Sequence, residues 1–228
     1  MEKGMERFFL KVEGGRSSNA KKDQSESKDC STRRNDRKIV IRELAESYKD
    51  EILSIAAKEL GEGYITSDLV EECIAQTERY IGKIAYDQRA RKVVGFSISY
   101  RVDQEQLTEL ISPDEKRIPR RLLQARALGV IKSIAVDRQA KGQGIGTELI
   151  EKTNHAFRKR GIDTVFTVAW KSEYGINLGG ILARLDFEPL IELPNYWTKD
   201  SIEQNFLCPV CGKPCSCSAV IYARSTSS

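Results

Sequence analysis

The chain has 228 residues, of which 40% are hydrophobic and 31% are charged, and its formal net charge is +4. This length supports one ordinary domain with a full core plus appended segments. The sequence contains no run of about 18 apolar residues, which excludes a transmembrane helix, and its N-terminus lacks the charged-then-apolar order of a secretory signal. We therefore expect a soluble protein of the cytoplasm.

Residues 1–37 do not have the pattern of a folded domain. The segment 16–38 contains eight Lys or Arg and four Asp or Glu. A basic segment can contact nucleic acid or an acidic partner, but the mixture of both signs and the absence of aromatic residues favour a solvated, disordered tail. We do not expect nucleic acid to be a partner.

The first nine residues, MEKGMERFF, place Met5, Phe8 and Phe9 at the spacing of one helical turn. An apolar face of this kind can dock in a groove. The segment resembles the peptides that bind sliding clamps of DNA replication, with Glu2 where such peptides usually carry Gln. The resemblance implies a sliding clamp or another protein as a partner of residues 2–9; the alternative is a tail that packs on its own domain or stays disordered.

From residue 38 the sequence becomes globular. KIVIREL alternates like a strand, and 43–60 carries apolar residues at helical spacing. Ser67, followed by acidic residues, is the expected N-cap of a helix that runs to about Arg79. Strands at 80–87 and 93–102, with a basic turn between them, predict an antiparallel hairpin.

The segment 103–127 is a charged insertion with a basic run at 116–121. It has the composition of a solvated connector, and a patch facing the substrate or an anionic partner is the alternative.

An apolar strand at 130–136 is followed by a glycine-rich turn, 141–146, which opens directly into an amphipathic helix at 147–160. The start of a helix has unpaired N–H groups and the positive end of the helix dipole, so this turn is a seat for a phosphate anion. A strand at 163–170, a glycine-containing helix to about Leu185 and strands at 186–193 and 218–224 follow. This order predicts an α/β (α+β layered) domain with one central sheet over 38–224.

Four of the six cysteines lie close together, namely Cys208, Cys211, Cys215 and Cys217. Without a secretory context, the cluster indicates metal ligands before disulfides. A C-x-x-C-G turn points two sulfurs at one centre, and four thiolates suit tetrahedral Zn²⁺ with a structural role and no open position for catalysis. The second half, C-S-C, is tighter than the usual spacing, and reduced or redox-active cysteine pairs are the alternative. The knuckle, 208–217, would form a small insertion before the last strand.

The turn Lys141-Gly142-Gln143-Gly144-Ile145-Gly146 follows SIAVD and precedes the later LARLDF. These features resemble the GNAT superfamily of acyl-CoA-dependent N-acyltransferases, over about 38–193. The frame 139–144 also fits the signature, but the first frame leads straight into the helix. The resemblance implies a GNAT-like mixed sheet flanked by helices. It also implies direct transfer of an acetyl group from acetyl-CoA to a primary amine of a protein N-terminus, a lysine or a small molecule.

The resemblance also implies roles for particular residues. The pyrophosphate of coenzyme A would be held by the backbone N–H groups of Lys141, Gly142, Gln143, Gly144, Ile145, Gly146 and Thr147. The pantetheine arm would pair with the strand edge at Ile134, Ala135 and Val136, and Asn177 would reach the same arm.

The family's catalytic tyrosine has no direct equivalent in this chain, which has Leu182 at that position and Asp186 in place of a glycine. Tyr174 and Tyr196 are the candidate acids. The spacing before Tyr196 resembles that of ribosomal-protein-alanine acetyltransferases, a likeness that also points to Glu188 as a base. The departures leave a second class open: a GNAT-fold module without turnover that binds acyl-CoA, or a partner through the zinc knuckle and the N-terminal peptide.

Overall fold

The structure is a computed structural model, and it describes residues 39–112 and 114–226. The N-terminal segment 1–37, with the clamp-like peptide at 2–9, lies outside the described residues. Among the helices of the described part, none is long and apolar enough to cross a membrane.

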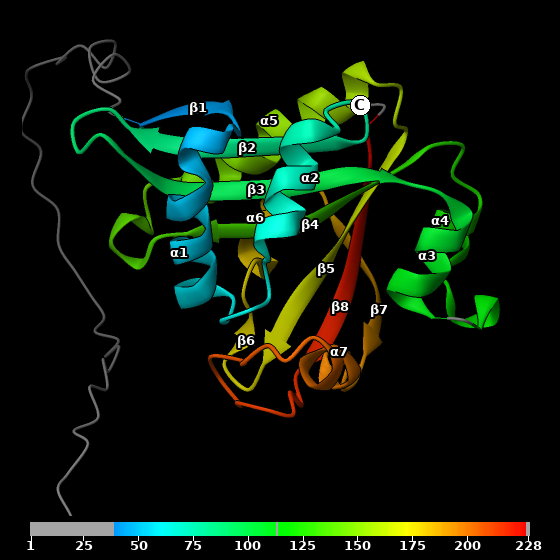
Figure 1. Ribbon diagram of the computed structural model, residues 1–228. Helices are drawn as coiled ribbons and strands as arrows, with labels where there is room; N and C mark the ends of the chain where they lie inside the picture. The colour runs from blue at the N-terminus through cyan, green and yellow to red at the C-terminus, as the bar shows by residue number, and fades with distance from the viewer. Residues whose placement is uncertain (1–38, 113, 227–228) are drawn as a thin grey trace, which may run out of the picture. The chain divides into compact units, whose positions relative to one another are not determined.

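The centre of the fold is one eight-stranded sheet in the order β1-β2-β3-β4-β5-β8-β7, with the short β6 paired to β5 alone (Figure 1). Its strands are β1 (Ile39–Glu43), β2 (Tyr80–Asp87), β3 (Lys92–Val102), β4 (Leu128–Val136), β5 (Thr164–Ser172), β6 (Gly175–Ile176), β7 (Glu188–Leu193) and β8 (Ser218–Ser225). The β4–β5 pair is parallel and the other pairs are antiparallel. The expected mixed central sheet and the hairpin of β2 and β3 are confirmed.

Helices cover both faces of this sheet. The α-helices are α1 (Lys49–Glu59), α2 (Ser67–Ala75), α3 (Gln104–Ile111), α4 (Arg120–Leu123), α5 (Ile145–Lys159), α6 (Gly179–Arg184) and α7 (Thr198–Glu203), and short 3-10 turns span 46–48, 115–117 and 138–140. One buried cluster includes Ile52 of α1 and Val70 of α2. A second includes Leu149 and Phe157 of α5. Because strand side chains alternate between the two faces, each face packs its own layer of helices.

Several helix boundaries differ from the expected ones, including the start of α1, which is Lys49 and not residue 43. The N-cap of α2 is Thr66, whose hydroxyl accepts a hydrogen bond from the Leu69 amide at 3.3 Å, so Ser67 is the first helical residue. The helix ends at Ala75, before the expected Arg79, because the next residue leaves the helical conformation. The α5 helix begins before the expected Thr147, since Gly144 is its N-cap.

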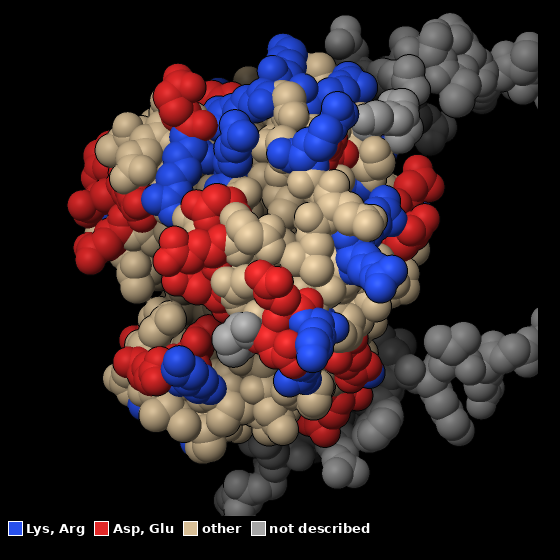
Figure 2. Space-filling view, turned by 90° about the vertical axis from the view of Figure 1, so that its right-hand side faces the viewer, with Lys and Arg blue, Asp and Glu red and all other residues tan. Residues whose placement is uncertain are grey.

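The prediction of a solvated connector at 103–127 is wrong. Leu107 and Leu122 are fully buried, and α3 begins with a capping box made by Asp103 and Gln106. A short acid or hydroxyl residue followed at the third place by Gln is a helix-start signal, which the charged surroundings obscured. Figure 2 shows the side of the molecule that faces right in Figure 1, with basic side chains in its upper part and acidic ones beside and below them.

The strands β4 and β5 separate partway along their length. They pair only between 128–131 and 164–167. On its other side, β4 pairs with β3 through Ser133 and Ile131 but not through Lys132, which is the extra residue of a β-bulge. The backbone of 132–136 that faces β5 is therefore available to a ligand.

Candidate active site

The glycine-rich turn lies at the start of α5. Gly142 and Gly144 both have φ of +80°, and a Cβ added to either would meet nothing within 4 Å. The backbone conformation, and not crowding, therefore requires glycine at these positions. The N–H groups of the first turn of α5 have no partner within the helix and can bind an anion.

This turn borders a cavity of about 400 Å³, called the donor cavity below. It is lined by predicted donor-site residues, namely Ile134, Ala135, Val136, Lys141, Gly142, Gly144, Ile145, Gly146, Thr147 and Asn177, and also by Glu59, Leu60, Ala140, Leu178, Ile181 and Arg184. Gln143 alone of the predicted set does not line it. The residues of α1 and α6 were not predicted from the sequence, because nothing local to them indicates that they fold against the turn.

The positive charge of the basic side chains at the donor cavity is partly neutralised by a carboxylate that lines the same cavity. The Lys141 ammonium lies 2.5 Å from a carboxylate oxygen of Glu59, a residue of α1, and Arg138 lies 4.0 Å from the same carboxylate. The Glu59 side chain is only 9% exposed. Because α1 holds the Lys141 side chain, the backbone N–H groups of the turn and the Arg184 side chain are the groups left to meet a phosphate.

A second cavity, of about 60 Å³ and called the inner cavity below, adjoins the first at the opening between β4 and β5. Both cavities are lined by Leu60, Ile134, Asn177 and Leu178. The other residues of the inner cavity are Tyr64, Lys132, Ser133, Thr167, Val168, Ala169, Trp170, Trp197, Phe206, Cys208 and Cys215. A ligand that enters along β4 therefore reaches a second, mainly apolar chamber.

Tyr64 is the only tyrosine that lines either cavity. It lies in the loop between α1 and α2, and its ring packs edge-on against Phe206 with centroids 5.4 Å apart. The Lys132 ammonium lies 5.7 Å from the centre of the Tyr64 ring. The Ser133 hydroxyl is buried without a hydrogen-bond partner among the described residues. Tyr64, Lys132 and Ser133 are thus among the polar groups of the inner cavity that can act on a bound ligand.

The catalytic residues predicted from the sequence lie elsewhere, and none lines either cavity. The Tyr196 hydroxyl donates to the Leu110 carbonyl oxygen at 2.5 Å, and burial raises the pKa of this phenol. Glu188 is exposed on β7 and pairs with Arg121, and Tyr174 is 84% exposed.

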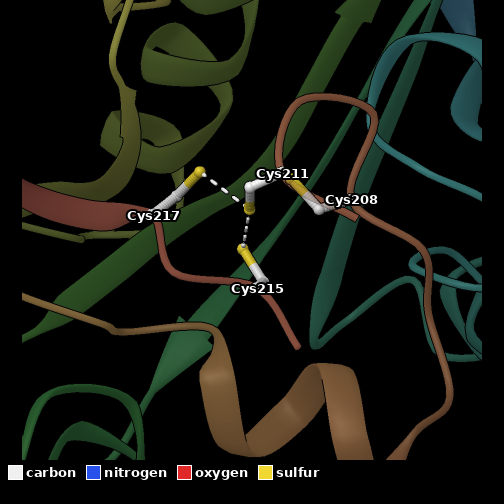
Figure 3. Close-up of side chains that lie close together, drawn as sticks. All are labelled: Cys208, Cys211, Cys215 and Cys217. Atoms are coloured by element: carbon white, nitrogen blue, oxygen red, sulfur yellow. Dashed lines mark hydrogen bonds between the residues drawn. The ribbon is translucent and has the colours of Figure 1, made fainter. Parts of the chain in front are cut away.

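The four clustered cysteines converge in the loop between α7 and β8 (Figure 3). Their Sγ atoms all lie within 4.8 Å of one another, and the Sγ atom of Cys211 is 3.5 Å from those of Cys215 and Cys217. A Zn–S bond of about 2.3 Å places the sulfurs of a tetrahedral site about 3.8 Å apart. The described cysteines are all free thiols. The donor set and its geometry therefore fit a zinc ion.

The chain turns sharply at the first two cysteines. Cys208 and Gly212 form an antiparallel bridge, and Gly212 has φ of +74°. Burial raises the pKa of the Cys211 thiol, but the Ser216 amide and the neighbouring thiols outweigh it and lower the pKa to about 6. Burial raises the pKa of Cys217 to about 11. A cluster in which one thiol deprotonates readily is suited to binding a cation.

The cysteine loop is bonded to the segment that carries Tyr64. The Leu207 amide donates to the Glu62 carbonyl oxygen at 3.1 Å. A Cβ added to Gly61 would lie 2.4 Å from the Leu207 carbonyl oxygen, so this close approach requires glycine. On the other side, the Cys215 amide donates to the Ser201 hydroxyl of α7 at 2.9 Å. The cysteine loop therefore joins two walls of the inner cavity.

Comparisons with known proteins relate these features to a protein family and to solved structures. The family model described as the Acetyltransferase (GNAT) family matches residues 42–175. A search of curated protein sequences gave no match. The solved ribosomal-protein-S18-alanine N-acetyltransferase from Escherichia coli is 19% identical, with a TM-score of 0.55 over 83% of this chain and 95% of that one.

Two further solved structures share the fold. The NAA60 protein of Arabidopsis thaliana, in complex with a bisubstrate analogue, is 13% identical, with a TM-score of 0.59 over 82% of this chain and 97% of that one. A polyamine N-acetyltransferase of Drosophila melanogaster is 15% identical, with a TM-score of 0.58 over 82% of this chain and 99% of that one. At these identities the likeness concerns the fold.

Proposed function

Because the chain belongs to the acetyltransferase (GNAT) family and is an N-acetyltransferase with acetyl-CoA as its cosubstrate, we propose that its acceptor is a primary amine bound in the inner cavity. The observation that carries this proposal is the junction of the two cavities, which share four lining residues where β4 leaves β5. A thioester that follows β4 from the glycine turn would present its carbonyl carbon at that junction. An amine in the inner cavity would then be within reach of it.

The donor side follows from the backbone. The N–H groups of 141–147 would hold the pyrophosphate, because they surround the start of α5 where an anion is favoured. The unpaired edge at Ile134, Ala135 and Val136 would bond the amides of the pantetheine arm. Asn177 lines both cavities and is placed to bond the arm near the thioester.

The acceptor amine attacks the thioester carbonyl, so a C–N bond forms and the C–S bond breaks. The amine loses a proton, and the thiolate of coenzyme A gains one. We assign the second transfer to Tyr64, because its ring lines the inner cavity. Tyr196, Glu188 and Tyr174 stay as predictions from the sequence, and Tyr64 is favoured over them because none of the three lines either cavity.

We also propose that Cys208, Cys211, Cys215 and Cys217 bind a structural zinc ion. Four protein ligands leave no open coordination position, so the ion would stabilise the loop and not take part in the reaction. Since Leu207 bonds to the segment of Tyr64 and Cys215 to α7, a rigid loop would fix the shape of the inner cavity.

Protein N-termini, lysines and small amines are the acceptor classes to test. The purified protein is incubated with acetyl-CoA and members of each class, and mass spectrometry detects products that are 42 Da heavier, the mass of an acetyl group that replaces a hydrogen atom. A gain of about 42 Da is the result expected from direct transfer of one acetyl group to the acceptor amine. Free coenzyme A is measured in parallel with a thiol reagent.

The alternative function is an acyl-CoA-binding module without turnover. It is favoured by Leu182, which is fully buried in the core at the position of the family's usual tyrosine. Binding of acetyl-CoA without acetylated product or acceptor-dependent release of coenzyme A would establish that alternative and overturn the proposed enzyme reaction.

A further inference from the structure

The bulge in β4 places two polar residues, Lys132 and Ser133, on the wall of the inner cavity. Lys132 has no paired residue on β3, because Ser133 pairs with Ile98 and Ile131 pairs with Ser99. Successive side chains of a regular strand point to opposite faces, but a bulge changes the direction of one of them. Both Lys132 and Ser133 line the inner cavity as a result.

Lys132 is the only Lys, Arg, Asp or Glu among the residues that line the inner cavity. No Asp or Glu of the described residues lies within the 4.0 Å of an ion pair to its ammonium. Tyr64, Tyr100 and the Asp200 carboxylate raise the pKa of Lys132 and burial opposes them, so the side chain stays protonated at neutral pH. Asp200 acts from beyond ion-pair distance, and a half-buried cation with no carboxylate of the described residues in contact favours an anion beside it.

We propose that the acceptor carries a carboxylate next to its reactive amine, and that Lys132 and Ser133 bind this carboxylate. The proposal rests on the proposed function and specifies its acceptor. The ammonium would form a charge-assisted hydrogen bond with one carboxylate oxygen. The Ser133 hydroxyl, which has no partner, would donate to the carboxylate as well.

The same charge disfavours the opposite class of acceptor. A polyamine or a peptide with a basic first residue would bring a second positive charge next to Lys132, in a cavity whose remaining walls are mainly apolar. Two like charges repel more strongly in such surroundings than in water. The inner cavity is therefore unlike one built for a polycation.

The size of the inner cavity limits the group that enters it. Its volume of about 60 Å³ is enough for roughly four to six water-sized groups, at roughly 10–15 Å³ for each. This space suits an amine and a carboxylate on one small residue. The carboxylate can belong to the side chain of an acidic first residue in a protein, or to the α-carboxylate of a free amino acid.

The test compares acceptors that differ in charge alone. Three peptides are identical except for a first residue of Glu, Gln or Lys, and free glutamate and its α-amide, which lacks the α-carboxylate, form a second arm. Each is assayed with the wild-type protein and with Lys132→Met and Lys132→Glu. Lys152→Glu is the control, since Lys152 is exposed on α5 and lines neither cavity. Acetyl-CoA affinity is measured for every variant to establish that it is folded.

In the wild type, kcat/KM for the Glu acceptor is expected to exceed that for Gln by roughly 10- to 100-fold, the range of a hydrogen bond to a charged group. Lys132→Met removes this preference, Lys132→Glu shifts it towards the Lys peptide, and Lys152→Glu leaves it unchanged. A preference for the Glu peptide over the Gln peptide places the carboxylate on a side chain; a preference for free glutamate over its α-amide makes it an α-carboxylate.

Equal wild-type rates with the Glu, Gln and Lys peptides, together with equal rates for free glutamate and its α-amide, would overturn the carboxylate proposal while leaving the N-acetyltransferase function intact. A preference for Glu that survives Lys132→Met would also overturn it. The absence of acetylation of any amine would overturn the proposed function, and this proposal with it. The wild-type comparison decides the question even if a Lys132 variant fails to fold.

Discussion

The donor cavity and the inner cavity share one wall, but the first is formed largely by backbone and the second by side chains. The donor cavity is lined largely by one continuous segment, the glycine turn and the start of α5, together with the edge of β4. The inner cavity is lined by residues from the α1–α2 loop, β4, β5, the segment before α6, the residues on either side of α7 and the cysteine loop. A backbone site can recognise the part common to all acyl-CoA thioesters, while a side-chain site determines which amine is accepted.

Substitution of Tyr64 is expected to have the largest effect, and this effect should fall on turnover and not on acetyl-CoA binding. Tyr64→Phe should lower kcat by about 100-fold, the lower range for loss of a general acid, with little change in acetyl-CoA affinity. Steady-state kinetics and calorimetric titration of acetyl-CoA measure the two quantities. Unchanged kcat would remove Tyr64 from the mechanism, and a large loss in Tyr196→Phe instead would restore the acid predicted from the sequence.

Removal of metal is expected to have the next largest effect, again on the acceptor alone. A chelator, or Cys215→Ser, should loosen the loop that joins Tyr64 and α7 and lower kcat/KM for the acceptor by about 100-fold, since small displacements of reacting groups cost about this much. Readdition of zinc should restore the chelated protein, and metal analysis gives its stoichiometry. Full acceptor turnover in metal-free protein would contradict the role assigned to the cysteine loop.

A change in the glycine turn should affect the opposite side. Gly144→Ala places a side chain on a residue with φ of +80°, which costs about 1–2 kcal/mol, and should weaken acetyl-CoA binding about tenfold. Gly161→Ala is a matched control, because Gly161 has φ of +71°, equally open surroundings and no place in either cavity. Equal affinity in the two variants would contradict the donor assignment.

The smallest effect concerns stability. Tyr196→Phe removes the hydrogen bond to the Leu110 carbonyl and should lower the free energy of unfolding by about 1 kcal/mol. Urea denaturation measures this change. An unchanged midpoint would mean that the hydroxyl contributes nothing to the contact between α3 and the segment before α7.

The two regions also differ in what could be predicted from sequence. The donor turn was predictable because strand, glycines and helix are adjacent in the chain, and each has a local physical signature. The cysteine cluster was predictable for the same reason. Tyr64 and Lys132 carry no such signature: the place of Tyr64 in the inner cavity arises from a loop that meets Leu207, and that of Lys132 from a bulge defined by its pairing with β3.

In the insertion 103–127, the sequence pattern gave a wrong prediction of solvent exposure. Its charge pattern indicates solvent exposure, yet Leu107 and Leu122 are in the core. Lys and Arg side chains can cover apolar neighbours, so charge density along a segment says little about the depth at which its few apolar residues lie. A capping box was the better guide to structure at Asp103.

The position of β8 has a consequence for biosynthesis. β7 leaves the ribosome before β8, but its place in the sheet is beside β8, which separates it from β5. Synthesis of the intervening residues 194–217 takes roughly one to five seconds at cellular rates. During that interval the backbone groups of β7 have no strand to pair with, and the four cysteines emerge within it. Zinc bound at that stage would order the loop 208–217 before β8 is made, and the hydrogen bond from the Tyr196 amide to the Cys217 carbonyl oxygen would place this loop beside the segment that follows β7.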